Sequence, residues 1–456
     1  MNKTESLNYR YLARIIIEAA TPIVVKSGEK NILTDGVVLR DVNGMPYIPG
    51  TSIAGVVRHA WKDAGMDVKE IFGFQEKKNG EGSKVIFTEA RILDSLGRVV
   101  DGLQPISDSL LLDYKQLPIR QHVRITEKGV AADKGKFDEE IVYAGTRFCF
   151  EMEMLGKGSD SENFDKLLNV LQDRTFRLGS GTRKGFGDIK LVSVWKKNLN
   201  LQVADDMDLY LSKSSNLEES CHWFRDEDKV ECTANSNGWT KYELLLTPEN
   251  FFLFGSGYGD DEADMTPVKE KKVNWENGIG QLSEYSYLIP ATSLKGAIAH
   301  RVAFHYNRLQ KKYADLLSEN ERESCVGKNN EAVRILFGSE GNEKGEGKLR
   351  GNVILSDLYL SDNVQDKLLN HVAIDRFTGG AIDGALFTEK VAYRKTAMPV
   401  IELWVNKLSD EVQVPFELTL DDICKGMLPL GGGVNRGNGL FTGVIYKNGE
   451  KLCVER

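Results

Sequence analysis

The sequence predicts an α+β protein made of two tandem ferredoxin-like domains with inserted loops and hairpins. Two observations support this prediction. The 456-residue chain contains an internal repeat, and each copy of it places strand-like segments around an amphipathic helix and ends in a glycine-rich loop. The length agrees, since at about 150 residues per domain the chain has room for two large domains or three smaller ones.

The composition is that of a folded chain with a sizeable core. It contains 41% hydrophobic and 28% charged residues and only 11 prolines, which excludes collagenous, mucin-like and wholly disordered proteins. No apolar run approaches the ~18 residues of a membrane span, and the N-terminal residues lack the apolar stretch of a signal peptide. The six cysteines form no CxxC pair, which argues against a zinc ribbon or a disulfide framework. We therefore expect a cytoplasmic protein with no membrane partner.

The internal repeat consists of four blocks that occur in the same order in each copy. The segment IPGTSIAGVVRH from Ile48 recurs as IPATSLKGAIAH from Ile289, a shift of 241 residues. A Phe-Gly and Gly-Glu-Gly block, a longer block that begins His-Val, and a glycine-rich block follow in both copies. The repeat places a first domain at residues 1–200 and a second at 241–456. The polar residues 201–240 between them fit either a linker or an insertion that forms a small helical element docked on one copy.

The elements of each copy can be assigned in chain order. The runs Tyr11 to Ile17 and Tyr242 to Leu246 are rich in aliphatic residues and predict strands. An extended piece ends at the Ile-Pro pair, where Thr51 or Ser52 could cap a helix. Helical spacing then predicts one buried face in each copy. Its residues are Ile53, Val56, Val57, Ala60 and Trp61 in the first copy, and Leu294, Ala297, Ile298 and Val302 in the second.

Each copy closes with a loop of unusual glycine density, at residues 179–187 and 431–439. Such a loop can bring backbone N–H groups close to a phosphate, although neither loop matches a Walker or a dinucleotide-binding motif. Because both loops carry basic side chains, a role in binding a nucleic-acid backbone is favoured over a purely structural turn. The net charge of −8 does not exclude such a role, since the acidic residues gather in stretches such as Asp205 to Asp208.

The IPGTS turn followed much later by the glycine-rich loop resembles the repeat-associated mysterious protein (RAMP) superfamily of CRISPR systems. Each copy is similar to the backbone subunit of type III effector complexes. The resemblance implies an RNA-recognition-motif-like ferredoxin fold, a guide CRISPR RNA, a target RNA and other effector subunits as partners, and endoribonuclease activity on the guide-paired target RNA.

The resemblance also implies one catalytic aspartate in the loop before each IPG-type turn, acting with Mg²⁺ or Mn²⁺. In this sequence the matching residues are Asp35 and Asp264, which are expected to be both catalytic and metal-binding. Twelve extra residues separate Asp264 from its turn, and Asp260 and Asp261 are rivals for the same role. One carboxylate per site is chemically sufficient, because RNA carries its own 2′-OH nucleophile and Mg²⁺ often binds through one or two carboxylates.

The expected RNA-binding residues come from three features of each copy: the start of the conserved helix, a basic hairpin that the resemblance identifies as thumb-like, and the glycine-rich loop. They are Ser52, Arg120, His122, Arg124, Gly179, Gly181, Arg183 and Lys184 in the first copy, and Ser293, Lys295, Arg376, Gly431, Gly433, Asn435 and Arg436 in the second.

Two other functions fit the same sequence. The chain could be a scaffold that binds the same RNA with one or both aspartates idle. It could also be a metal-independent endonuclease that processes guide RNA through His59 or His300. Both histidines follow the buried helix stripe, so a packed or hydrogen-bonded core position is favoured for them over catalysis.

Overall fold

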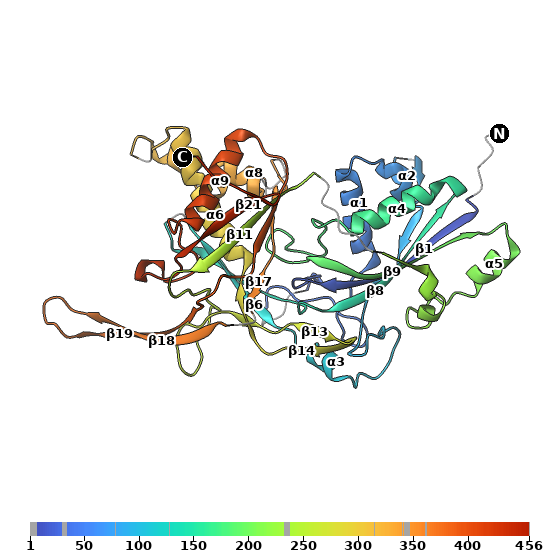
Figure 1. The fold of residues 1–456 in the computed structure, drawn as a ribbon, viewed down its shortest axis with the longest axis horizontal. Helices are drawn as coiled ribbons and strands as arrows, with labels where there is room; N and C mark the ends of the chain where they lie inside the picture. The colour runs from blue at the N-terminus through green and yellow to red at the C-terminus, as the bar shows by residue number, and fades with distance from the viewer. Residues whose placement is uncertain are drawn as a thin grey trace.

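The computed structural model describes residues 7–29, 34–77, 79–126, 128–231, 238–313, 315–339, 341, 347–360 and 363–455. Two α+β units lie side by side, the first coloured blue to green and the second yellow to red (Figure 1). In each unit the helices cover one face of an antiparallel sheet. The repeat predicted from the sequence therefore corresponds to two units of the same construction.

The first unit is built on a sheet whose strand order is β10-β9-β1-β8-β4, with β5 also paired to β8 and every pairing antiparallel. Its elements from the N-terminal strand to helix α4 are β1 (Tyr9–Ala19), α1 (Gly50–Asp63), α2 (Val68–Phe72), β2 (Phe74–Glu76), β3 (Asn79–Glu81), β4 (Val85–Phe87), β5 (Arg91–Ile92), α3 (Ser109–Asp113), β6 (Ile119–Ile125), β7 (Ala131–Glu140), β8 (Arg147–Gly156) and α4 (Ser161–Leu171). The remaining elements are β9 (Ile189–Asn200), α5 (Ala204–Leu211) and β10 (Lys229–Val230).

The second unit repeats this plan with a sheet of strand order β16-β20-β11-β21-β22. Its elements are β11 (Thr240–Pro248), β12 (Lys269–Glu270), β13 (Val273–Glu276), β14 (Ile279–Leu282), β15 (Ser286–Ile289), α6 (Ala291–Leu309), α7 (Glu319–Cys325), α8 (Glu331–Phe337), β16 (Val353–Leu355), β17 (Leu358–Leu360), β18 (Gln365–Ile374), β19 (Ala381–Tyr393), β20 (Ile401–Val405), α9 (Asp410–Cys424), β21 (Phe441–Lys447) and β22 (Glu450–Lys451).

The two sheets correspond strand by strand. Their order along the chain is β1-α1-β4-β8-α4-β9 in the first and β11-α6-β16-β20-α9-β21 in the second. In both, the first strand lies between the third and the fourth, and the second strand lies outside the third. This order is consistent with the ferredoxin-like arrangement expected from the sequence.

The conserved helices begin one residue after the proline of each Ile-Pro pair. Pro49 and Pro290 are the N-caps of α1 and α6, and neither helix has a side-chain cap. The prediction that Thr51 or Ser52 caps the first helix is therefore wrong, because the helix already begins at Gly50. The predicted apolar faces are found: Ile53, Val57 and Trp61 are buried in the first core, with Val56 and Ala60 partly buried beside them.

Residues 201–231 pack on the first unit and do not form a free linker. Strand β10 extends the sheet beyond β9, and Phe224 packs against Leu12 and Leu199 on the sheet face opposite the helices. The buried Arg14 donates hydrogen bonds to the Leu217 carbonyl at 2.7 Å and to Ser220 Oγ at 2.8 Å. The described residues 201–231 thus form a small element with helix α5 that packs against the first sheet on the face opposite α1 and α4.

The twelve extra residues of the second copy form the hairpin β13–β14, which packs on the first unit. Val273 N–H donates to the Ala144 carbonyl at 2.7 Å, and Trp275 Nε1 donates to the Gly145 carbonyl at 2.8 Å. The guanidinium of Arg147 lies 4.1 Å from the centre of a Trp275 ring. The insertion thus joins the two units and leaves the loop around Asp264 comparable with that around Asp35.

Candidate functional site

Asp35 lies at the base of the hairpin β6–β7, where its loop is held against β7. Asp35 N–H donates to Asp138 Oδ1 at 2.9 Å, and Asp138 N–H donates back to Asp35 Oδ2 at 3.3 Å. Both bonds involve exposed groups. The loop aspartate predicted from the sequence is therefore fixed by the backbone of the hairpin strand, with a second carboxylate beside it.

Asp264 has the same position in the second unit, at the base of the hairpin β18–β19. Thr388 N–H donates to Asp264 Oδ2 at 2.8 Å, and Thr388 Oγ donates to the same oxygen at 3.1 Å. These hydrogen bonds lower the pKa of Asp264. Asp138 and Thr388 each precede a buried glutamate on the second hairpin strand. Asp35 and Asp264 therefore occupy equivalent positions beside the two hairpins.

The rival aspartates of the second loop have other surroundings. Asp260 forms an ion pair with Lys390 at 2.7 Å and accepts hydrogen bonds from the backbone N–H groups of Glu262 and Ala263. Asp261 is exposed. Only Asp264 is bound by the hairpin strand in the way that Asp35 is, so geometry favours it as the counterpart.

The two aspartate sites differ in the group that faces the carboxylate. In the first unit it is the carboxylate of Asp138, and in the second it is the hydroxyl of Thr388. Within the described ranges, no group of three or more His, Cys, Asp or Glu side chains could hold a metal ion. One or two carboxylates fit Mg²⁺ or Mn²⁺ only if water and phosphate oxygens supply the other ligands, which is the usual habit of Mg²⁺.

The glycine-rich loops pack closely against the segments that lead from β1 and β11 to the aspartate loops. A Cβ on Gly179 would lie 2.7 Å from the Val24 carbonyl oxygen, and one on Gly431 would lie 2.4 Å from that of Leu253. Both glycines have positive φ, at 90° and 91°. These two residues therefore have a packing requirement for glycine that is independent of any ligand.

A group of cations lies where the first glycine-rich loop meets the start of α6. Gly185 of this loop lies so close to Ala291, the first residue of α6, that a Cβ on Gly185 would be 2.5 Å from the Ala291 Cβ. Lys295 lies in the first turns of α6, and burial, Lys184 and Arg183 together lower its pKa to about 8. Burial and the neighbouring Arg350 and Arg177 also lower the pKa of Arg183. In the part of the chain that is described, neither Lys295 nor Arg183 forms an ion pair with a carboxylate.

The other residues expected at the helix starts and on the hairpins are distributed as follows. Ser52 and Ser293 are partly exposed in the first turns of α1 and α6, Arg124 is exposed on β6, and Arg376 is exposed in the loop that joins β18 to β19. The hairpin β18–β19 projects from the second unit (Figure 1), and Phe377 at its turn is fully exposed.

Arg120 has a role different from the expected contact with RNA. It is buried, and its guanidinium contacts Glu270 at 2.6 Å and Asp357 at 2.5 Å, both in the second unit. His122, on the same side of β6, is also buried and stacks on Phe137 with ring centres 4.8 Å apart. Strand alternation turns both side chains inward, so neither faces the solvent where RNA would bind.

The paired histidines of the conserved helices do not lie in the core. His59 is exposed and its ring nitrogen lies 2.8 Å from the Gly55 carbonyl oxygen, one turn earlier on α1. His300 is partly buried. The expectation of a core position is therefore wrong, whereas the expected hydrogen bond is present at His59.

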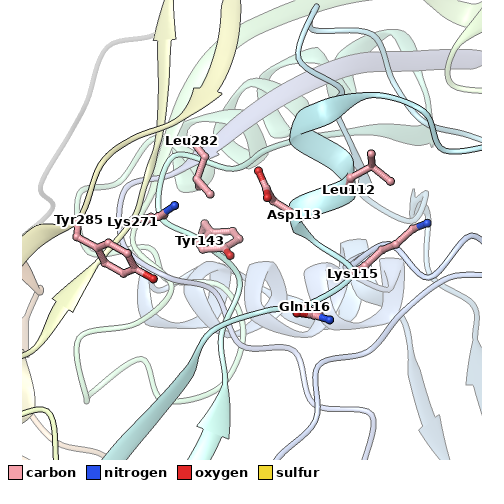
Figure 2. Close-up of a pocket in the computed structure, with 8 residues that line it drawn as sticks. All are labelled: Leu112, Asp113, Lys115, Gln116, Tyr143, Lys271, Leu282 and Tyr285. Atoms are coloured by element: carbon pink, nitrogen blue, oxygen red, sulfur yellow. The ribbon is translucent and has the colours of Figure 1, made fainter. Parts of the chain in front are cut away.

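A pocket between the units contains none of the predicted site residues. Figure 2 shows its walls, with Asp113 and Tyr143 from the first unit and Lys271 and Tyr285 from the second. Burial raises the pKa of Tyr143 to about 12. The pocket belongs to the contact between the units. Neither Asp35 nor Asp264 lines it, and the cation group around Lys295 does not line it either.

Sequence reasoning missed four residues next to the aspartates: Asp138, Thr388, Glu139 and Glu389. Asp138 and Thr388 differ in type, so the repeat gave no signal for them. Glu139 and Glu389, by contrast, are identical and follow the repeated histidines at nearly the same distance. The repeat alignment could have identified this pair.

Comparisons with known proteins agree with the repeat. The family model for the RAMP superfamily matches residues 16–190 and, again, residues 246–442. The chain is also 30% identical over 202 residues to a protein of Methanocaldococcus jannaschii named "CRISPR system Cms endoribonuclease Csm3"; the match covers 38% of this chain and 75% of that protein. Among the helices described, none is long and apolar enough to cross a membrane.

Proposed function

Because the chain belongs to the RAMP superfamily as a tandem fusion of two of its units, we propose that it is a guide-RNA-binding backbone subunit of a type III CRISPR effector complex. Each unit, a ferredoxin-like domain, contributes one cleavage position on the paired target RNA. The observation that carries this proposal is the matching placement of Asp35 and Asp264, each bound by a backbone N–H of the hairpin strand.

At each site the protein positions a carboxylate at the edge of a hairpin that can separate guide from target. The N–H of Asp138 or Thr388 engages one carboxylate oxygen and fixes its direction. The other oxygen can then receive the proton of the RNA 2′-OH or hold a cation. Mg²⁺ or Mn²⁺, when held by Asp35 or Asp264, would supply positive charge for the phosphate at which cleavage occurs.

The RNA backbone is proposed to cross the cation group formed by Arg183, Lys184 and Lys295. These side chains converge near the start of α6, and their positive charge favours a phosphate. The face of the first sheet opposite its helices is not a route for RNA, because residues 201–231 cover it. Arg120 and His122 are left out of this surface because both are buried.

The remaining partners follow from the same proposal. The guide and target RNA and the other effector subunits would occupy the exposed loops and hairpins, including Arg124 and Arg376. A soluble RNA-guided complex of this kind is expected in the cytoplasm.

The test is target-RNA cleavage by the guide-loaded complex with Mg²⁺, with 5′ ends mapped for each variant. We expect two cuts; Asp35→Ala slows one by about 100-fold or more, and Asp264→Ala slows the other. Glu29→Ala and Asp261→Ala, which change exposed acidic residues of the same two loops, serve as matched controls and should leave both cuts intact. If both cuts persist in the double variant while RNA stays bound, the chain is a scaffold.

One observation favours a partial version of the scaffold alternative. Thr388 replaces Asp138 beside the second aspartate, so the second site offers a single carboxylate to a cation. A single cut that depends on Asp35, with Asp264→Ala silent, is the outcome that this alternative predicts. No feature of the described structure favours RNA processing through His59 or His300.

A further inference from the structure

We propose that Glu139 and Glu389 are positioning residues for the two cleavage sites. Each holds the second strand of its hairpin in place, and this strand presents the backbone N–H that binds the loop aspartate. The inference rests on the proposed function of Asp35 and Asp264, and it assigns a role to two residues that do not themselves contact those carboxylates.

In the first unit, Glu139 directly follows Asp138 on β7 and is 1% exposed. Its Oε2 lies 2.9 Å from Lys26 Nζ, and its Oε1 lies 3.2 Å from Nε2 of His122 on the paired strand. The histidine ring stacks on Phe137. The carboxylate thus contacts both the other hairpin strand and the residue from which the Asp35 loop departs.

The second unit contains the same arrangement around Glu389, which directly follows Thr388 and is fully buried. His371 Nε2 lies 2.9 Å from Glu389 Oε1, and the His371 ring stacks on Phe387 with centres 4.8 Å apart. Arg436 pairs with the other oxygen, Oε2. The histidine, the stacked phenylalanine and the glutamate therefore recur at equivalent positions of the two hairpins.

The glycine-rich loop contacts each of these clusters through a cation. In the first unit, Lys184 Nζ lies 4.5 Å from the centre of the Phe137 ring. In the second, Arg436 lies over the Phe387 ring at 5.4 Å and also bonds Glu389. The glycine-rich loop therefore meets the hairpin at Phe137, two residues before Glu139, in the first unit, and at Phe387 and Glu389 in the second.

Stability alone does not explain two buried carboxylates of this kind. A buried ion pair is often no more stabilising than apolar residues of similar volume, because both charges lose their hydration. Burial opposes ionisation of Glu139, but His122 and Lys26 outweigh it and lower its pKa to about 2. The pKa of Glu389 is lowered as well, by Arg436 and His371 against the effect of burial. Both carboxylates are therefore charged at neutral pH and can orient their partners.

The cation that contacts the carboxylate differs between the units, and the histidine forms a hydrogen bond with the glutamate only in the second, whereas the glutamate, the histidine and the phenylalanine keep the same places on the two strands. Lys26, which precedes the aspartate loop, serves in the first unit, and Arg436 of the glycine-rich loop serves in the second. Retention of the glutamate with different partners indicates a constraint on where the hairpin strand lies.

The test compares Glu139→Met and Glu389→Met in the guide-loaded complex under single-turnover conditions. Methionine fills a similar volume without a charge, so the fold is retained while the contacts are lost. We expect Glu139→Met to slow the cut assigned to Asp35 by about 10- to 100-fold, because small displacements of a reacting group have effects of this size. The other cut and the affinity for target RNA stay unchanged, and Glu389→Met gives the reciprocal result.

The conservative variants Glu139→Gln and Glu389→Gln should recover part of the rate, since an amide oxygen can still accept from the neighbouring cation. A loss of both cuts in either methionine variant, or of target affinity in parallel with rate, would indicate a general structural role and overturn the inference. So would an unchanged rate at both positions in a folded complex.

Hydrogen exchange gives a readout that does not depend on cleavage. In Glu139→Met we expect faster exchange in the peptides around Asp35 and Asp138, with those around Asp264 and Thr388 unchanged. If exchange rises in this way but Asp35→Ala leaves both cuts intact, the positioning holds and the proposed function fails. If exchange is unaffected, the positioning role is excluded whatever the aspartate variants show.

Discussion

The ammonium group of Lys295 lies among other cations at the start of α6, and its charge state should therefore report on the binding of an anion. Burial, Lys184 and Arg183 lower its pKa to about 8, which is well below the ordinary value of ~10.4. A bound phosphate would favour the charged form and return the pKa toward the ordinary value. Binding RNA then takes up a proton above pH 8, so affinity falls as the pH rises through this value.

We expect the dissociation constant for RNA to increase about tenfold between pH 7 and pH 9, which follows from these two pKa values. Lys295→Arg should remove most of this pH dependence, because arginine keeps its charge in this range. Lys312→Arg changes an exposed lysine near the far end of α6 and is the matched control. A pH profile that is identical in the parent chain and Lys295→Arg would place the RNA elsewhere.

Single residues also show where the sequence was sufficient and where it was not. The family resemblance indicated Asp35, and the repeat then indicated Asp264, because a duplicated chain keeps the order of its loops; their catalytic role stays a prediction. Arg120 was misassigned because net basic character does not tell which face of a hairpin a side chain occupies; its acceptors, Glu270 and Asp357, come from the other copy and lie far away in sequence. Long-range pairing of this kind leaves no local pattern.

At the level of elements, the glycine-rich loops have two requirements that the sequence could not separate. The glycine density of the loops indicated a backbone that binds an anion. Their packing shows that Gly179 and Gly431 are needed for a close approach to the backbone of Val24 and Leu253. Gly431 combines a positive φ with a carbonyl oxygen only 2.4 Å from the point that a Cβ would occupy, whereas Gly437 has a positive φ of 88° and no heavy atom within 4 Å of the corresponding point.

We therefore expect Gly431→Ala to lower the free energy of unfolding more than Gly437→Ala does. The latter incurs only the backbone strain of about 1 kcal/mol, and the former adds a clash that requires the segment around Leu253 to move, for a total of about 2–4 kcal/mol. Urea denaturation of the two variants measures the difference. Equal losses would mean that the loop relaxes away from Leu253 and that packing does not require glycine there.

On the scale of the whole molecule, the buried ionic contact made by a hairpin runs in one direction, from the first unit to the second. The first hairpin inserts Arg120 between two carboxylates of the second unit, Glu270 and Asp357. The equivalent position on the second hairpin is Leu369, which pairs with Glu389 across the hairpin as Arg120 pairs with Glu139. The second hairpin therefore lacks the charge that makes this joint.

The acidic residues that a hairpin arginine could contact also have different partners in the two units. In the first unit the acidic residues at the same places are Asp41 and Glu89, and Arg91 of the same unit contacts both, at 3.4 and 2.5 Å. Tyr359 stands where Arg91 would be in the second unit, and it donates a hydrogen bond to Glu270 at 3.0 Å. The acidic pair of the first unit is thus neutralised by an arginine of the same unit, whereas the acidic pair of the second unit is neutralised by Arg120 of the first.

The joint predicts a large effect of removing the arginine alone. Arg120→Met leaves Glu270 and Asp357 buried without a cation, which should cost about 3–5 kcal/mol of the free energy of unfolding, because an uncompensated buried charge loses its hydration without gaining a partner. Arg91→Met is the matched control: its partner Glu89 is half-exposed and can return to water, and its other partner, Asp41, still accepts hydrogen bonds from the backbone N–H groups of Asn43 and Met45, so a smaller loss is expected. Thermal and chemical denaturation of both variants provide the comparison.

A triple variant decides whether charge or packing carries the joint. Arg120→Met combined with Glu270→Gln and Asp357→Asn removes all three charges while preserving their approximate volumes, and we expect it to recover most of the stability that Arg120→Met loses. If the triple variant is as unstable as the single one, the loss comes from packing against Phe186, over whose ring the guanidinium lies at 4.8 Å, and not from unpaired carboxylates. Recovery would show that the loss in Arg120→Met comes from two carboxylates left buried without a cation, and not from lost packing.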